Sequence, residues 1–529
     1  MPYKAINNPN TYRSRPKTEN VRMADFWESG IISTVPKLIV SIFLLAMLTG
    51  LFADPLVPPT IIGSVSLSYN PADVVYTKIE LHHASNDSLV AEVYPDTDGS
   101  FSFSTYAGQY YLAIEMFRPD LAKFTYPIKT QVINIPNTSY LADLGTIQMN
   151  QYNMSSVKVS TNTAHPYFKA IGQALVKIFS AVNGGYNGNS ATLHLFQDEY
   201  ELSSLNFNYT SSANNALNLN IVGLGTNGVS IEPEENHISV TAHRVNTTFS
   251  NIRFVNELNI DDDCLLFFNP STNAKYYFNN CHFGKTEYNY RFGCVSFNGI
   301  SGLSFYNCQF QNINNSDTNN TYATTGHGSV KFIDCSDINI DTSVFAYNSA
   351  FGGGAIYLEN CDDVNISSCQ FNYNMALQGT DGSIVWGHPG GAIYAKNSSE
   401  IKILDNQFCN NTTTGSGGAV YLELSSQFDI SGNLFKDNVV DHVGLSGSQS
   451  DALGFENCAF TTNDTISHNI IHSGLETSPI SPSDFIAIGG NCSGTLKLTN
   501  GLFIKGNLDT NYNKKIITSF SPVNLDFVN

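Results

Sequence analysis

A motif that ends in one aromatic or large apolar residue recurs through residues 252–503 at intervals of 26 to 37 residues. Self-similarity at such a period indicates a solenoid, in which each repeat stacks on the next. Runs with period two, such as Val364-Asn365-Ile366, lie near the recurring residue and indicate strands. The longer intervals suit coils that carry an inserted loop. The recurring residue, called the anchor below, is Phe254, Phe283, Phe310, Phe345, Phe371, Phe408, Phe435, Ile471 or Phe503.

Stacked strands would place like residues above like residues, because neighbouring strands lie about 4.8 Å apart. The anchors would then form a buried aromatic column. The position two before the anchor mostly holds Cys, Asn or Ser, the small or amide side chains that a tight interior turn requires. Stacked Asn amides can hydrogen-bond to one another and to the turn backbone. We therefore predict an all-β chain in which residues 157–529 form a right-handed, single-stranded parallel β-helix.

Ten cysteines are present, and none precedes Cys264. Three of them share the position two before the anchor, and Cys335 and Cys361 share a second equivalent position. This placement favours free structural thiols that act as small apolar side chains. Disulfides between neighbouring coils remain the alternative, and the absence of a Cys-x-x-Cys motif disfavours a metal site. The three cysteines before an anchor are Cys281, Cys308 and Cys369.

A second motif, Gly-Gly-Ala-Ile/Val-Tyr, occurs at residues 353–357, 390–394 and 417–421, and each copy is followed by Phe-x-x-Asn. The glycines permit a turn with positive φ, and the Ala then enters a crowded interior. The two motifs together resemble the repeats of the polymorphic outer-membrane protein adhesins, closely over residues 326–438 and loosely over 157–529. The resemblance implies a β-helix that is displayed at a cell surface.

Residues 60–149 predict a small β-sandwich. Alternating runs indicate strands, and Asp96-Thr97-Asp98-Gly99 indicates a tight turn between two of them. The order of a Gly-containing strand, Asp-x-Asp-Gly-Ser-Phe and Gly-x-Tyr-x-Leu resembles the carboxypeptidase regulatory-like domains, which implies a module without catalytic residues. Asp96 and Asp98 have the chemistry to bind Ca²⁺, although a hairpin turn needs the same residues. The predicted strands include residues 61–67, 78–81, 100–103, 110–114 and 144–147.

Apolar residues at helical spacing, from Phe168 to Val182, predict a helix over residues 166–182. Gly184-Gly185 would end this helix. A solenoid has an end with unpaired backbone groups, and an amphipathic helix is a suitable cover for it. The helix is therefore expected to cap the N-terminal end of the β-helix.

The uncharged apolar run from Leu38 to Ala53 follows several basic residues. It is long for the core of a signal peptide and slightly short for a membrane-spanning helix. Residues 1–53 are therefore interpreted as a leader that contains a cleaved export signal, with an uncleaved N-terminal anchor as the alternative. The protein is expected to be secreted or held at the cell surface, with membrane contact only through an uncleaved leader.

Charged residues make up only 13% of the chain, and its formal net charge is −19. This charge disfavours nucleic acid and anionic membrane surfaces as partners. The expected partners are a polysaccharide or a cell-surface protein. No cofactor is expected, although Ca²⁺ is possible, and the consecutive carboxylates of Asp261, Asp262 and Asp263 are the candidate ligands.

The sequence favours adhesion or glycan binding over catalysis. Parallel β-helices also include polysaccharide lyases and glycoside hydrolases, so catalysis is the main alternative, and a passive structural surface protein is the third. Gly326-His327-Gly328 matches part of a polygalacturonase pattern, but it also fits the repeat, and no catalytic residue is assigned. The candidate ligand-binding residues are the motif tyrosines, which would face outward if the strands alternate, and one loop tryptophan: Tyr357, Tyr394, Tyr421 and Trp386. The alternative is that these tyrosines help to cover the interior of the helix.

Overall fold

The computed structural model describes most of residues 58–528, so the predicted leader at 1–53 and the aspartates 261–263 lie outside the described residues. The stretches between 58 and 528 that are not described are 69, 119–122, 127, 137–139, 150, 162–166, 184–187, 197–198, 209–215, 226–228, 235–237, 256–263, 270–273, 285–293, 316–326, 378, 381–384, 442–449, 473–483, 505–516 and 520–521.

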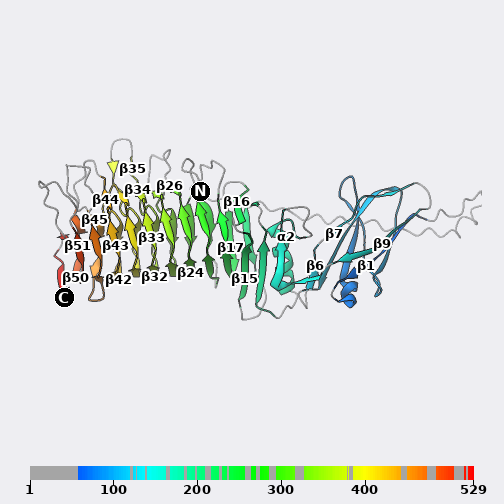
Figure 1. Cartoon of the computed structure of the whole chain (residues 1–529), viewed down its shortest axis with the longest axis horizontal. Coiled ribbons are helices and arrows are strands. Elements are labelled where there is room, and N and C mark those ends of the chain that lie inside the picture. Colours follow the sequence, from blue (N-terminus) through cyan, green and yellow to red (C-terminus); the bar gives the residue numbers. More distant parts are fainter. Residues whose placement is uncertain are drawn as a thin grey trace, which may run out of the picture.

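The N-terminal unit consists of two sheets that enclose a core of their own, as predicted for a small β-sandwich (Figure 1). A three-stranded sheet has the order β4–β1–β9, and β5 and β2 lie at the centre of a larger sheet. Ile61, Leu112 and Ile114 are fully buried because they lie on the strand faces that point between the two sheets. The bounds are β1 Thr60–Leu67, β2 Thr77–His83, β4 Ser100–Ser104, β5 Gly108–Arg118 and β9 Leu141–Met149.

Helix α2 (Ile171–Asn183) lies between the sandwich and the coils and covers the first coil (Figure 1). It begins at Ile171 and not at the predicted residue 166. The reason is that Phe168 forms a parallel β-bridge with Val159, which extends the first sheet of the coils. On the sandwich side, Lys177 Nζ lies 2.8 Å from Glu115 Oε1, so the helix links the two units.

The rest of the described chain is a parallel β-helix, as predicted, and forms a long rod of stacked coils (Figure 1). One coil runs through β32 (Asp362–Ser367), β33 (Gln370–Asn372), β34 (Met375–Ala376) and β37 (Ile393–Lys396). β32 belongs to a sheet of 14 strands, called sheet 1, and β33 to a sheet of 11, called sheet 2. β37 belongs to another sheet of 11, called sheet 3, and β34 to a short sheet of five, called sheet 4.

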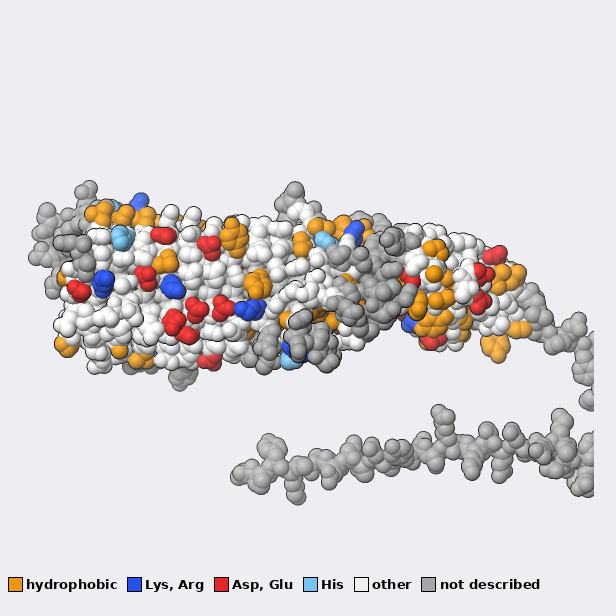
Figure 2. Space-filling view, turned by 90° about the horizontal axis from the view of Figure 1, so that it is seen from below, with side chains coloured by type: hydrophobic (Ala, Val, Ile, Leu, Met, Phe, Trp, Pro, Cys, Tyr) orange, Lys and Arg blue, Asp and Glu red, His pale blue; other side chains and the backbone are white. Residues whose placement is uncertain are grey.

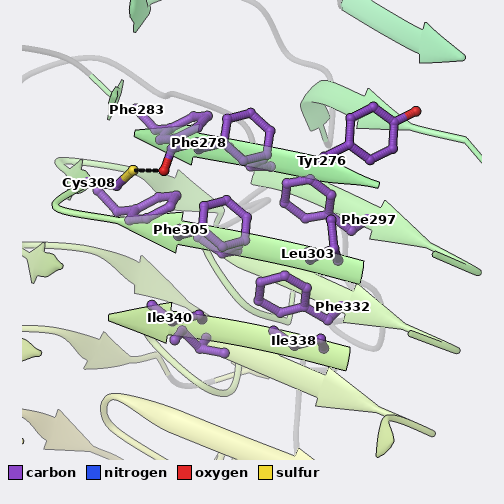
Figure 3. Packing of buried hydrophobic residues seen from close by; sticks show 14 of the residues in the cluster. Tyr276, Phe278, Phe283, Phe297, Leu303, Phe305, Cys308, Phe332, Ile338 and Ile340 are labelled. Atoms are coloured by element: carbon purple, nitrogen blue, oxygen red, sulfur yellow. Dashed lines mark hydrogen bonds between the residues drawn. The ribbon is translucent and has the colours of Figure 1, made fainter. Parts of the chain in front are cut away.

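The anchors pair in register from coil to coil in sheet 2, which confirms the predicted column. The aromatic neighbours from Phe254 to Phe435 stack with ring centroids 4.6 to 5.0 Å apart and planes within 12° of parallel. Figure 3 shows rings from three sheets meeting in the interior. The register pairs are Phe254↔Phe283, Phe283↔Phe310, Phe310↔Phe345, Phe345↔Phe371, Phe371↔Phe408, Phe408↔Phe435, Phe435↔Ile471 and Ile471↔Phe503.

A buried ladder of amides follows the anchors, at the Asn of Phe-x-x-Asn. Asn374 Nδ2 donates to Phe345 O at 3.0 Å and to Asn411 Oδ1 at 2.9 Å. Its own Oδ1 accepts bonds from the backbone N and the Nδ2 of Asn348. Asn438 extends the ladder by a further coil. These amides satisfy turn groups that would otherwise be buried without partners.

The paired glycines of the second motif have two separate roles. Gly353, Gly390 and Gly417 have φ of +60°, +72° and +70°, the left-handed conformation that glycine adopts most readily. The second glycine of each pair lets neighbouring coils approach. A Cβ on Gly391, for example, would lie 2.1 Å from the carbonyl oxygen of Gly418. The motif is therefore explained by the geometry of the coils.

The described cysteine side chains are free thiols, as the sequence favoured. Cys308 Sγ lies 3.3 Å from the carbonyl oxygen of Phe278 and donates to it (Figure 3). Burial raises the pKa of Cys335 to about 11 and that of Cys361 to about 12, so both remain protonated. Cys308, Cys335 and Cys361 thus fill interior turns, and their weak donors satisfy backbone carbonyls.

Substitution of Asn374 by Ala should lower the free energy of unfolding by about 3 kcal/mol, because it leaves several buried groups without hydrogen-bond partners. Urea unfolding followed by circular dichroism would measure the change. The matched control is Asn206→Ala, since Asn206 is an exposed strand residue that bonds only to surface hydroxyls. That variant should change stability by less than about 0.5 kcal/mol. Equal effects of the two substitutions would contradict the structural role of the ladder.

Candidate functional site

The three motif tyrosines lie in register on the outer side of sheet 3, in β31 (Ile356–Glu359), β37 and β41 (Val420–Glu423). They are only 5% to 6% exposed and form a cluster separate from the main core. Tyr357, Tyr394 and Tyr421 therefore do not present a free surface to a ligand, and their burial fits the alternative that they help to cover the coils. Their side chains do point away from the coil interior, but other parts of the chain cover them.

The cover is provided by the glycine-rich turns that precede the strands of sheet 3. A Cβ on Gly352 would lie 3.2 Å from Cδ1 of Tyr394 and 2.6 Å from Nδ1 of His327, so this turn packs directly against both rings. Gly454, in the next strand beyond Tyr421, would place a Cβ 2.6 Å from the Cδ2 of that tyrosine. Each strand of the row is consequently buried on both sides.

The tyrosine hydroxyls are engaged by carboxylates of the following coil. Tyr394 donates to Glu423, and Tyr421 donates to Glu456. Burial raises the pKa of both tyrosines well above the usual range, and the bonded carboxylates raise it further. Both hydroxyls are therefore protonated donors with fixed acceptors.

Two histidine rings pack against this row of tyrosines. The His327 ring stacks on Tyr357 with centroids 4.9 Å apart, and the His388 ring is 5.5 Å from that of His327. Burial lowers the pKa of His327 to about 3, helped by the neighbouring His388, Lys331 and Lys396. Burial also lowers the pKa of His388 to about 4. Both imidazoles are therefore neutral at physiological pH.

The cluster of the three tyrosines and two histidines is covered and tightly packed, and it is not an accessible reaction centre. General acid–base catalysis needs a group within hydrogen-bond reach of the substrate, whereas these hydroxyls are buried and already bonded. The placement of His327 follows from the repeat, since Val330 pairs with Ile356 and so aligns 328–330 with the Gly-Ala-Ile of the next coil. The polygalacturonase-like triplet is thus accounted for by the fold.

Trp386 lies in the short strand β36 (Val385–Trp386), which pairs antiparallel with β35 (Gly379–Thr380) in a loop hairpin. Its side chain lies outside the described part of the structure.

The candidate Ca²⁺ ligands Asp261, Asp262 and Asp263 also lie outside the described part of the structure. In the sandwich, Asp98 Oδ1 accepts bonds from the backbone N and the hydroxyl of Ser100, which is the turn role expected of it. Across the described residues, no group of three or more His, Cys, Asp or Glu side chains is arranged to hold a metal ion.

A different pair of aromatic residues is exposed, and the sequence analysis missed it. Tyr347 and Tyr373 occupy the turn between sheets 2 and 4 in neighbouring coils, 44% and 51% exposed. Their rings stack with centroids 5.1 Å apart and planes within 4°. The sequence did contain a signal for this pair. The Phe-x-x-Asn copies that begin at Phe345 and Phe371 read Phe-x-Tyr-Asn, whereas the next two copies carry Asn410 and Asp437 before the Asn.

The comparisons with known proteins agree with the coil geometry. A model of the Chlamydia polymorphic membrane protein repeat matches residues 407–423, a segment that holds one Phe-x-x-Asn and one Gly-Gly-Ala-Val. The chain is a parallel β-helix protein with a polymorphic membrane protein-like repeat. No comparison supports the carboxypeptidase regulatory-like resemblance of the sandwich, which stays a prediction. No curated protein matches the chain.

Among solved structures, the chain is similar to the Yersinia enterocolitica Family 28 exopolygalacturonase. The match has 9% sequence identity and a TM-score of 0.27, and it covers 85% of this chain and 94% of that chain. A similarity at this level carries no inference about activity. Within the described residues, no helix has the length and apolar character needed to cross a membrane.

Replacement of both His327 and His388 by Phe should flatten the dependence of stability on pH. In the unfolded chain these histidines take up protons below about pH 6.5, but in the folded protein they do so only near pH 3 to 4. Stability linked to them is therefore complete above pH 6.5 and falls as the pH is lowered. Thermal melting from pH 8 to pH 5 would measure it. A double variant whose melting temperature falls as steeply as that of the natural protein would refute the buried neutral state.

Proposed function

We propose that this chain is an exported, non-catalytic surface protein that binds polysaccharide through the outer side of its β-helix. The supporting observation is the repetition of hydrogen-bonding amides along the exposed turns. Asn397 Nδ2 donates to Asn360 Oδ1 at 2.6 Å, and Asn360 in turn donates to Asp334 at 2.9 Å. Rows of polar groups at one coil spacing suit a ligand that is itself an extended polymer.

The polymorphic membrane protein-like repeat supports the surface location. The matched residues 407–423 pair in register with the preceding coil, Phe408 with Phe371 and Tyr421 with Tyr394, so the likeness concerns the stacked coils themselves. Secretion through the leader and adhesion to a cell are parts of this proposal. Labelling of intact cells with an antibody against the β-helix would test the location directly.

The charge of the protein favours a neutral polysaccharide over an acidic one. The face shown in Figure 2 is mostly uncharged, with scattered acidic and basic side chains on the coils. The net charge of −19 would repel a polyanion such as polygalacturonate. Hydroxyl groups of a neutral polymer can both donate to and accept from side-chain amides.

Affinity electrophoresis through gels that contain β-1,4-glucan, galactomannan, starch or polygalacturonate would test the proposal. We expect retardation by at least one neutral polymer, weaker retardation by polygalacturonate, and no new reducing ends or unsaturated products, with or without Ca²⁺. Release of such products would instead establish the lyase or hydrolase alternative. Migration unchanged by every polymer would leave a passive structural role and refute polysaccharide binding.

A further inference from the structure

We infer that the stacked pair Tyr347 and Tyr373 is a contact site for a neutral polysaccharide, an inference that rests on the proposed function. Both residues lie on the turn that joins sheets 2 and 4: Tyr347 between β29 (Val344–Ala346) and β30 (Ser349–Ala350), and Tyr373 between β33 and β34 of the next coil. Among the described residues the two rings keep 44% and 51% of their surface exposed, in contrast to the tyrosine row of sheet 3. The pair therefore presents aromatic surface to solvent in the described structure.

The backbone conformation at this position does not favour tyrosine. Tyr347 and Tyr373 have φ of +58° and +56°. In the neighbouring coils the same turn position holds Asn312, Asn410 and Asp437, also with positive φ. Asn and Asp tolerate this left-handed conformation, whereas a bulky residue adopts it at a cost.

Burial does not compensate for this cost. Each ring remains about half exposed, although a buried tyrosine would gain from the transfer of its apolar surface out of water. The stacking of one ring on the other offsets only part of the free-energy cost of the backbone conformation. The turn itself is held by backbone bonds, Tyr347 N to Asn372 O at 3.0 Å and Tyr373 N to Cys409 O at 3.1 Å. The backbone of the turn is thus held in place before any ligand arrives.

The surroundings define the class of ligand. Asn312 borders the pair on one side and Asn410 on the other, and both side chains are shorter than a tyrosine. The outer part of the Tyr347 ring therefore extends beyond Asn312, and the outer part of the Tyr373 ring extends beyond Asn410. Met375 adds an apolar surface that is 42% exposed. An apolar ring face beside amide groups, without charge in these positions, fits a sugar ring that offers C–H bonds on its face and hydroxyls at its edge.

The test is affinity electrophoresis of the full chain with the neutral polymer that retards it most strongly. Tyr347→Asn/Tyr373→Asn should weaken retention at least tenfold. The double variant should melt at the same temperature as the natural protein or higher, because Asn suits positive φ. The control is Tyr306→Asn, since Tyr306 is 54% exposed in another part of the coils, and its loss should leave retention unchanged.

The outcomes separate this inference from the proposed function. If the double variant binds as tightly as the natural protein, polysaccharide binding stands and the site lies elsewhere. Equal losses in the double variant and in Tyr306→Asn would also overturn the assignment. If none of the neutral polymers retards the natural protein, the proposed function fails, and the assignment of these tyrosines fails with it.

Discussion

In-register stacking of each coil on the next determines almost every other feature of the molecule. Backbone hydrogen bonds between parallel strands repeat at about 4.8 Å, so a residue type that suits one level of the rod recurs at the next. The aromatic column of sheet 2 is the clearest result, with stacked rings from Phe254 to Phe435. A mismatch at one level would disturb its two neighbours, because each coil contacts mainly those. The stability of the rod therefore depends on uniform spacing.

The same constraint explains the polar interior. Tight turns leave carbonyl and N–H groups that the sheets do not use, and a column of Asn side chains reaches them from one coil to the next, as at Asn374 and Asn411. Free thiols fill other interior turns of the coils and donate to backbone carbonyls. Glycine occurs where neighbouring turns approach too closely for a Cβ. Function is thereby left to the outer side chains, which the stacking does not fix.

The sequence predicted the interior well because interior positions repeat. The register of all nine anchors, the thiol positions and the amide column two positions before the anchor, from Asn406 to Asn433 and Asn469, follow from the requirement that stacked residues match. The exterior was harder to predict. Period-two alternation places Tyr357 on the outer side, but whether that side is free depends on turns such as the one at Gly352. The exposure of Tyr373 could have been suspected, since a bulky residue replaces Asn in one copy of a repeat.

The stacking itself can be tested by measuring which residues on the outer side of sheet 1 lie close together. Lys402 pairs with Asn365 in the coil before it and with Asp429 in the coil after it. Cysteines at 402 and 429 should be joined efficiently by a thiol cross-linker that spans one strand spacing, as identified by peptide mapping. Cysteines at 365 and 429 are two coils apart, about 10 Å, and should not be joined by the same reagent. Absence of the first cross-link, or equal yields of the two, would contradict the stacked coils.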